Sequence, residues 1–190
     1  MKKNVFFSLA IAAALVSCNS GSGDSDLSAD SGQHDTEHFS ENENALETVQ
    51  IEKSNQISNL LDSYFVTKDA LKDDNAEGAK EGIAQFVVNL DEAKADNVPA
   101  DLLTSLESNS EAIQQGDIAV QREHFEKLSH DMKELVLLVG ADRDVYQQYC
   151  PMYKNDEGGM WLSQHEDLLN PLFGSQMLKC GFNQEKLAVQ

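Results

Sequence analysis

Sulfur-bearing side chains gather in one C-terminal stretch of the chain, residues 150–181, which reads CPMYKNDEGGMWLSQHEDLLNPLFGSQMLKCG. This stretch holds two of the three cysteines, three of the five methionines and the single tryptophan. Thiolates and thioethers are soft ligands that select Cu(I), and thiolates also suit Zn(II). The stretch therefore predicts a site for a soft metal ion, with Cu(I) as the expected ion. Its candidate ligands are Cys150, Met152, Met177 and Cys180, with Met160 and His165 in reserve.

The spacing of these residues allows two pairs of ligands. Cys150 and Met152 lie two residues apart, so a turn at Pro151 is needed to direct both toward one ion. Met177 and Cys180 are three residues apart and share a face if their segment is helical. The two pairs together would form a cage of two thiolates and two thioethers. Trp161 could shield such a cage from water and oxidation.

A disulfide between Cys150 and Cys180 is the alternative to a metal site. In an exported protein these two cysteines can pair, because the extracytoplasmic space permits disulfides. The bridge would close a loop of about thirty residues and stabilise the domain by roughly 3–4 kcal/mol. The methionines would then fill gaps in the core, and Trp161 would be a structural core residue. The two states can also alternate with redox conditions, because a metal needs free thiolates.

The N-terminus has the pattern of an exported lipoprotein. Residues 1–17 combine two lysines with a short apolar run, which predicts a bacterial signal peptide. Cys18 follows Leu-Val-Ser, as in a lipobox, so we expect it to carry a covalent lipid such as palmitate. The alternative is an ordinary signal peptide with an incidental cysteine. We expect a location in the bacterial cell envelope, at the outer membrane, facing the periplasm or the cell surface, with the lipid anchor as the only attachment to the membrane.

The composition of residues 18–50 predicts a disordered acidic tether, because apolar residues are sparse there and follow no regular spacing. His34 and His38 have metal-ligand spacing on a helix, but nothing predicts a helix there. The chain has a net charge of −19, which argues against binding nucleic acid, whose backbone recruits lysine and arginine.

Residues 51–190 predict one helical domain. Apolar residues recur at helical spacing in four segments, which cover about residues 54–72, 76–93, 99–116 and 118–139. Asp117 is the expected cap of the last segment, and Gly140 its expected end. Short joints favour an all-α, antiparallel up-down four-helix bundle. Residues 150–181 would then form a cap of loops and short helices on that bundle.

Three polar residues lie on the last predicted helix. Arg122 falls at the edge of the apolar face, so we expect a structural role in which it braces a carboxylate or a backbone carbonyl. His130 points away from that face and is expected to be exposed. His124 lies on the flank of the face, where a surface histidine is a more ordinary interpretation than a ligand.

Several blocks of sequence occur together in a recognisable order. They are Tyr64, Lys68–Leu71, Arg122 with Phe125, Cys150–Met152, Trp161–Ser163, Asn170–Gly174 and Met177–Gly181. In these blocks the chain resembles an uncharacterised all-helical domain of exported bacterial lipoproteins, which is also fused to periplasmic adaptor subunits of heavy-metal efflux pumps. The resemblance covers roughly residues 60–181. The chain departs from the pattern of that domain at Leu172, where an aromatic residue is expected, and at Gly159–Met160. The resemblance implies a link to copper or other heavy-metal handling.

The sequence therefore supports two functional hypotheses. The first is a lipid-anchored envelope protein that binds Cu(I) and buffers it or passes it to an efflux system. The second is a helical interaction module without metal, which docks onto an envelope partner such as an efflux adaptor and contains a Cys150–Cys180 disulfide. We do not expect an enzyme, because no phosphate loop, zinc-protease motif or hydrolase triad is present. Cys150 as a nucleophile would have only His165 as a nearby base, with nothing that fixes their geometry.

Overall fold

The computed structural model describes residues 46–95 and 97–190. The predicted signal peptide, the lipidated Cys18, the His34/His38 pair and most of the predicted tether lie outside the described residues. None of the helices in the described part of the chain is both long enough and apolar enough to cross a membrane.

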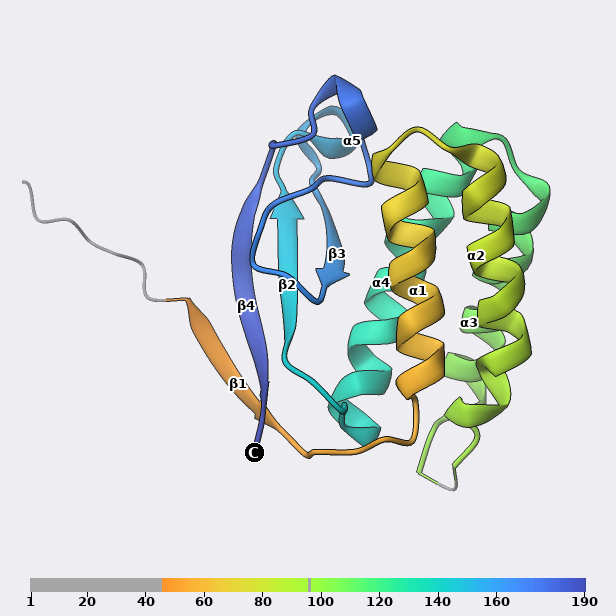
Figure 1. Ribbon diagram of the computed structural model, residues 1–190, viewed down its shortest axis with the longest axis vertical. Coiled ribbons are helices and arrows are strands. Elements are labelled where there is room, and N and C mark those ends of the chain that lie inside the picture. Colours follow the sequence, from red (N-terminus) through yellow and green to blue (C-terminus); the bar gives the residue numbers. More distant parts are fainter. Residues whose placement is uncertain (1–45, 96) are drawn as a thin grey trace, which may run out of the picture. The chain divides into compact units, whose positions relative to one another are not determined.

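The four predicted helices are present. They are α1 (Ser58–Lys72), α2 (Ala76–Asn89), α3 (Ala100–Gln115) and α4 (Ile118–Val139), with a short 3-10 segment η1 (Leu90–Ala93) after α2 (Figure 1). The carboxylate of Asp117 caps α4 by accepting hydrogen bonds from the amides of Ala119 and Val120. The helix ends at Gly140, whose positive φ of 79° is a conformation that glycine adopts without steric cost.

The prediction of an all-α four-helix bundle with a loop and short-helix cap is wrong, because the chain also forms a four-stranded sheet. Its strands are β1 (Glu47–Ile51), β2 (Val145–Cys150), β3 (Gly159–Ser163) and β4 (Phe182–Val189). Their order across the sheet is β1-β4-β2-β3, with β1 parallel to β4 and the other neighbours antiparallel. The expected cap therefore contributes β3 and the last residue of β2, Cys150, to a sheet that stands beside the helices (Figure 1). Strand β1 begins at Glu47, inside the segment expected as tether.

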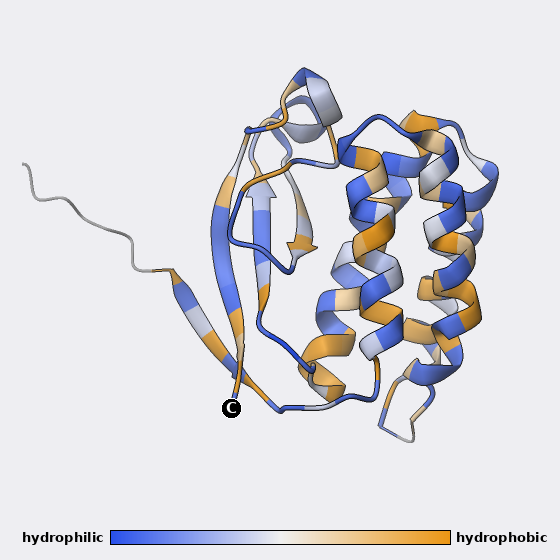
Figure 2. Ribbon diagram, viewed as in Figure 1, coloured by the Kyte–Doolittle hydropathy of each residue, from blue (hydrophilic) through white to orange (hydrophobic). Residues whose placement is uncertain are grey.

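Burial on both faces of β2 and β3 explains why the sequence did not reveal these two strands. All five residues of β3 are buried, so the strand lacks the alternation of apolar and polar residues that marks a half-exposed strand. In β2, Gln147 and Gln148 occupy buried positions on opposite faces. Much of β2 accordingly carries hydrophilic colours in Figure 2, although four of its six residues are buried.

The inner face of the sheet packs against the helices. The hydroxyl of Tyr64 on α1 accepts a hydrogen bond from the amide of Leu162 on β3, at 2.9 Å, and lies 2.6 Å from the hydroxyl of Ser129 on α4. Tyr64 is fully buried and its ring stacks on that of Phe125, with centroids 4.9 Å apart. One side chain thus ties two helices to the sheet.

The outer face of the sheet is covered by the chain between β3 and β4. The side-chain amide of the buried Gln148 donates to the carbonyl oxygens of three consecutive loop residues, which are His165, Glu166 and Asp167. Within this connection lies a short 3-10 turn, η2 (Gly174–Gln176).

The segment labelled α5 (Tyr153–Asp156) follows β2 and is not a regular helix. Lys154, Asn155 and Asp156 have positive φ values of 50°, 56° and 71°. Three consecutive residues other than glycine in the left-handed region are costly, and such backbone strain clusters at functional sites.

Candidate functional site

The two cysteines of the C-terminal stretch meet. Cys150 is the last residue of β2 and is buried, whereas Cys180 ends the loop before β4 and is half-buried. Both are free thiols, and their Sγ atoms lie 2.9 Å apart. This separation is longer than an S–S bond of about 2.05 Å but brings the two sulfurs into direct contact.

The approach of Cys180 depends on the glycine that follows it. Gly181 has a φ of +129°, and a Cβ at this position would lie 2.5 Å from the carbonyl oxygen of Tyr149 on β2. A larger residue would push the loop away from the strand. Gly181 therefore lets the chain turn into β4 with Cys180 still against the end of β2.

The neighbouring thiol controls the acidity of Cys180. The hydrogen bond with Cys150 is the largest cause that raises the pKa of Cys180 to about 11, and desolvation and the charge of Cys150 act in the same direction. A backbone contact from Met152 opposes them. At neutral pH the Cys180 thiol keeps its proton, so a metal ion or an oxidant must displace that proton to engage the sulfur.

The backbone brings a methionine next to each thiol. Met152 follows Cys150 through Pro151, and its side chain is 49% exposed. The carbonyl oxygen of Met177 accepts a hydrogen bond from the amide of Cys180 at 2.9 Å, so the two residues share one turn. A methionine residue therefore lies within one turn of each cysteine along the chain, and Met152 is at the surface.

Met160, another predicted ligand, is not brought to the thiols. Met160 pairs with Tyr149 across the β2–β3 ladder, whereas Cys150 pairs with Gly159. Because side chains alternate along a strand, Met160 and Cys150 project from opposite faces of the sheet. Met160 lines a separate cavity of about 370 Å³ beside α4, together with Glu126 and His130.

His165, the remaining predicted ligand, has an exposed side chain. Its backbone is fixed by Ser163, whose hydroxyl donates to the His165 carbonyl oxygen at 2.8 Å.

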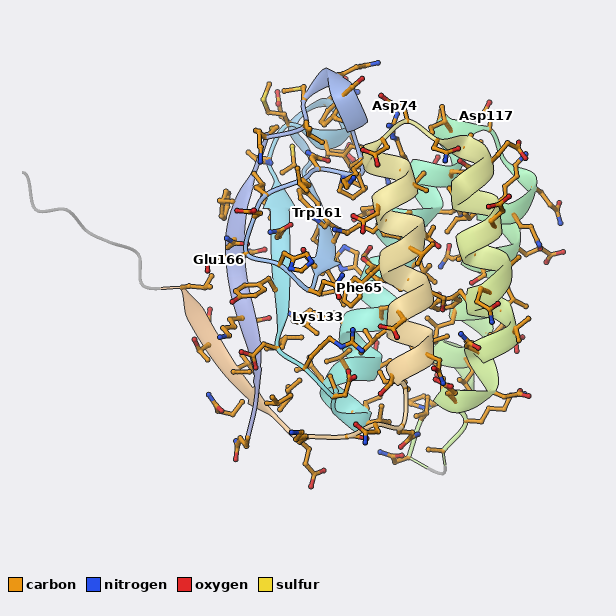
Figure 3. All side chains as sticks on the ribbon, viewed as in Figure 1. Phe65, Asp74, Asp117, Lys133, Trp161 and Glu166 are labelled. Atoms are coloured by element: carbon orange, nitrogen blue, oxygen red, sulfur yellow. The ribbon has the colours of Figure 1, made fainter. Side chains whose placement is uncertain are left out.

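Trp161 lies on the same face of the sheet as Cys150, since its ladder partner is Gln148. Trp161, which Figure 3 labels, is fully buried. Its indole nitrogen donates to the Oε1 atom of Gln148 at 2.8 Å. A Cβ at Gly181 would lie 3.4 Å from the indole ring, so Trp161 packs beneath the turn that follows Cys180.

The two histidines on α4 make local contacts. The Nδ1 atom of His124 lies 3.0 Å from the side-chain oxygen of Asn109, and burial lowers the pKa of His124. His130 lies 2.9 Å from a carboxylate oxygen of Glu126, and its side chain is 61% exposed.

Within residues 46–95 and 97–190, no three His, Cys, Asp or Glu side chains converge as a metal site.

Sequence reasoning missed the residues that hold the Cys180 loop. Asn170 bonds to the backbone of that loop, and Asp74 bonds to it from the turn between α1 and α2. For Asn170 a signal existed, because asparagine side chains often bond to the backbone two residues on. For Asp74 the sequence held no comparable signal, since its partners Arg122 and Ser175 lie 48 and 101 positions away.

Comparison with known proteins adds one partial match. A family model described as "Protein of unknown function (DUF3347)" matches residues 60–144. The matched region runs from α1 to the start of β2 and stops short of both cysteines. It agrees with the resemblance drawn from the sequence over the helical part of the chain, and it carries no link to lipoproteins or to efflux adaptors. No curated protein and no solved structure matches the chain significantly.

Proposed function

We propose that this protein binds Cu(I) through Cys150 and Cys180, with Met152 and Met177 as weaker thioether donors. The observation that carries the proposal is the contact between two thiols from positions 150 and 180, whose sulfur atoms lie 2.9 Å apart. A methionine lies within a turn of each thiol. Thiols and thioethers are soft donors, and this combination selects Cu(I) over hard cations such as Mg²⁺ and Ca²⁺.

The unequal exposure of the donors suggests how the ion enters and leaves. Cys150 is fully buried, whereas Cys180 is half-buried and Met152 is 49% exposed. An ion would first meet the exposed thioether and would be held at the buried thiol. Transfer to an acceptor would reverse this order by ligand exchange. Trp161, buried on the same face of the sheet, excludes water from the inner side of the thiol pair.

The cellular part of the proposal rests on the N-terminal sequence and on the resemblance to a lipoprotein domain. We propose that Cys18 anchors the protein by a lipid in the bacterial cell envelope. There the protein would buffer Cu(I) or pass it to a metal-efflux adaptor.

A second candidate function is supported by the same sulfur contact. Thiols this close need little movement to form a disulfide, which would fix the Cys180 loop to the sheet. The protein would then be an interaction module that docks onto an envelope partner without a metal.

A competitive titration distinguishes the two functions. The full-length mature chain, reduced and free of oxygen, would be titrated with Cu(I) against a chromophoric chelator. We expect one tightly bound equivalent, which is lost in Cys150→Ser and in Cys180→Ser. Met152→Leu and Met177→Leu should each weaken binding, whereas Met160→Leu, on the other face of the sheet, should leave it unchanged.

Binding that persists in both serine variants would overturn the proposed site. Non-reducing mass spectrometry of the untreated protein provides the second readout. A fully bridged protein that takes up no Cu(I) even after reduction would favour the docking module.

A further inference from the structure

The loop that carries Cys180 is closed on itself by one buried asparagine. The backbone amide of Asn170 donates to the carbonyl oxygen of Leu178 at 2.9 Å, and its side-chain amide donates to the carbonyl oxygen of Cys180 at 3.0 Å. Its side-chain oxygen accepts hydrogen bonds from the amides of Leu172 and Phe173. Residues 170–180 therefore form a ring that the hydrogen bonds of Asn170 close, and Cys180 is its last residue.

An arginine on α4 holds this ring from outside. The Nε atom of Arg122 donates to the carbonyl oxygen of Pro171 at 3.0 Å. Its Nη2 atom donates to the carbonyl oxygen of Leu71 at the end of α1, at 2.9 Å, and pairs with the carboxylate of Asp74. Arg122 thus joins the ring to two helices through a planar fork that lysine cannot reproduce.

Asp74 completes the attachment from the turn between α1 and α2, where Figure 3 labels it. One of its carboxylate oxygens pairs with Arg122, and the other accepts a hydrogen bond from the amide of Ser175 at 3.1 Å. The residue has a positive φ of 57°, a conformation that directs the chain out of α1 and into α2.

Gly174 makes this close contact feasible. It has a φ of +59°, and a Cβ at this position would collide with the carboxylate of Asp74 and with the guanidinium of Arg122. The ion pair therefore fits against the ring only where the ring presents a glycine.

We propose that Asp74, Arg122 and Gly174 form a latch that positions Cys180 against Cys150. Cys150 is held by β2 whether or not the latch is closed. The separation of the two sulfurs consequently depends on where the latch places the ring. The latch would set the equilibrium between free and bridged thiols, and, where the proposed Cu(I) function holds, the affinity for the ion as well. Asp74 and Arg122 act through the loop and are positioning residues.

The chain offers a matched control for Asp74. Asp144 also accepts a backbone hydrogen bond, from Val189 at 3.0 Å, and also pairs with a cation, Lys186 at 2.7 Å. These contacts join the start of β2 to the end of β4 and touch no residue of the ring. Asp74→Asn and Asp144→Asn therefore remove similar interactions, of which only one supports the ring.

The experiment compares these variants in glutathione buffers of varied ratio. Two protein thiols and one glutathione disulfide give the Cys150–Cys180 bridge and two molecules of glutathione. In Asp74→Asn we expect the equilibrium constant for bridge formation to fall about tenfold, because releasing the ring lowers the effective concentration of one thiol at the other. Arg122→Lys should behave in the same way, and Asp144→Asn should match the parent protein. Thermal unfolding identifies any variant that is not folded.

A Cu(I) titration of the same variants separates the latch from the proposed function. Outer residues that orient metal ligands typically contribute about 10–100-fold to affinity, so Asp74→Asn should weaken Cu(I) binding by at least about tenfold. If the parent protein binds no Cu(I) but Asp74→Asn still shifts the glutathione equilibrium, the latch stands and the metal function fails. If Asp74→Asn matches Asp144→Asn in both measurements, the latch is overturned.

Discussion

Deprotonation of Cys180 controls the chemistry of the site, because the thiol must lose its proton before the sulfur can bind a metal or attack a disulfide. The hydrogen bond with Cys150 is the main reason that its pKa rises from the ordinary value of 9.0 to about 11. A second negative charge beside a thiolate is unfavourable, so the pair resists losing both protons. A bound cation would remove this resistance.

The reactivity of Cys180 toward alkylation should follow this pKa. In the reduced protein, the rate of modification of Cys180 by iodoacetamide should rise with pH and reach its midpoint near 11. In Cys150→Ala the midpoint should move toward the ordinary value, because the hydrogen bond that is the main cause of the raised pKa is gone. Mass spectrometry of the modified peptide gives the rate at each pH. Equal midpoints in the two proteins would contradict this account.

The raised pKa of Cys180 also affects the stability of the folded protein at high pH. A thiol whose pKa is raised in the folded state holds its proton more tightly there than in the unfolded chain. Between pH 9 and about 11 the reduced protein should therefore lose stability as the pH rises. Cys180→Ala should show a weaker loss over this range, measured as the urea midpoint at each pH. A steeper loss in the variant would count against the assignment.

The stability that Asp74 contributes changes with pH in the opposite direction, because it is lost as the pH falls. The hydrogen bonds of Asp74 to Ser175 and Arg122 lower its pKa from 3.8 to about 2. The stabilisation from the latch should be complete above pH 3.8 and should disappear as the pH falls through about 2. Urea midpoints of the parent protein and Asp74→Asn should therefore differ at pH 5 and converge at about pH 2. A constant difference across this range would show that the carboxylate is not the group responsible.

At the scale of elements, local signals identified the helices and missed the sheet. Each helix has an apolar face of period 3.6, and the caps at Asp117 and Gly140 lie where their side-chain chemistry places them. Strands β2 and β3 are covered on both faces, so polar Gln147 and Gln148 occupy buried positions and no alternation appears. What covers the outer face is a loop, and its position depends on contacts between residues far apart in the sequence.

The hydrogen bond between Tyr64 on α1 and Leu162 on β3 connects the helices to the sheet, and we expect its loss to lower stability. Tyr64→Phe removes the acceptor for the amide of Leu162 and leaves this buried donor unsatisfied. The free energy of unfolding should fall by about 1–3 kcal/mol, measured by urea denaturation. Tyr146→Phe serves as the control and should cost less, because the Tyr146 ring, which lies 5.5 Å from the ammonium of Lys186, is retained in phenylalanine.

At the scale of the whole molecule, the sequence pointed to the two cysteines that meet, but not to how the fold brings them together. The composition of residues 150–181 indicated soft ligands, and the thiols of Cys150 and Cys180 do lie together. Two other features could not be predicted. Met160 is separated from the thiols by the alternation of side chains along a strand that the sequence did not reveal. The latch joins Asp74 to a loop between β3 and β4, through Ser175, which lies 101 positions further along the chain.

The measurement that tests the central claim most directly is X-ray absorption at the copper edge of the full-length mature protein, loaded with one equivalent of Cu(I) under reducing conditions. The account predicts a first shell composed of sulfur in the parent protein. In Cys180→Ser this shell should lose a sulfur or the protein should lose its copper. A shell of nitrogen and oxygen, or a spectrum unchanged by removal of both cysteines, would contradict the assignment of Cys150 and Cys180 as the copper site.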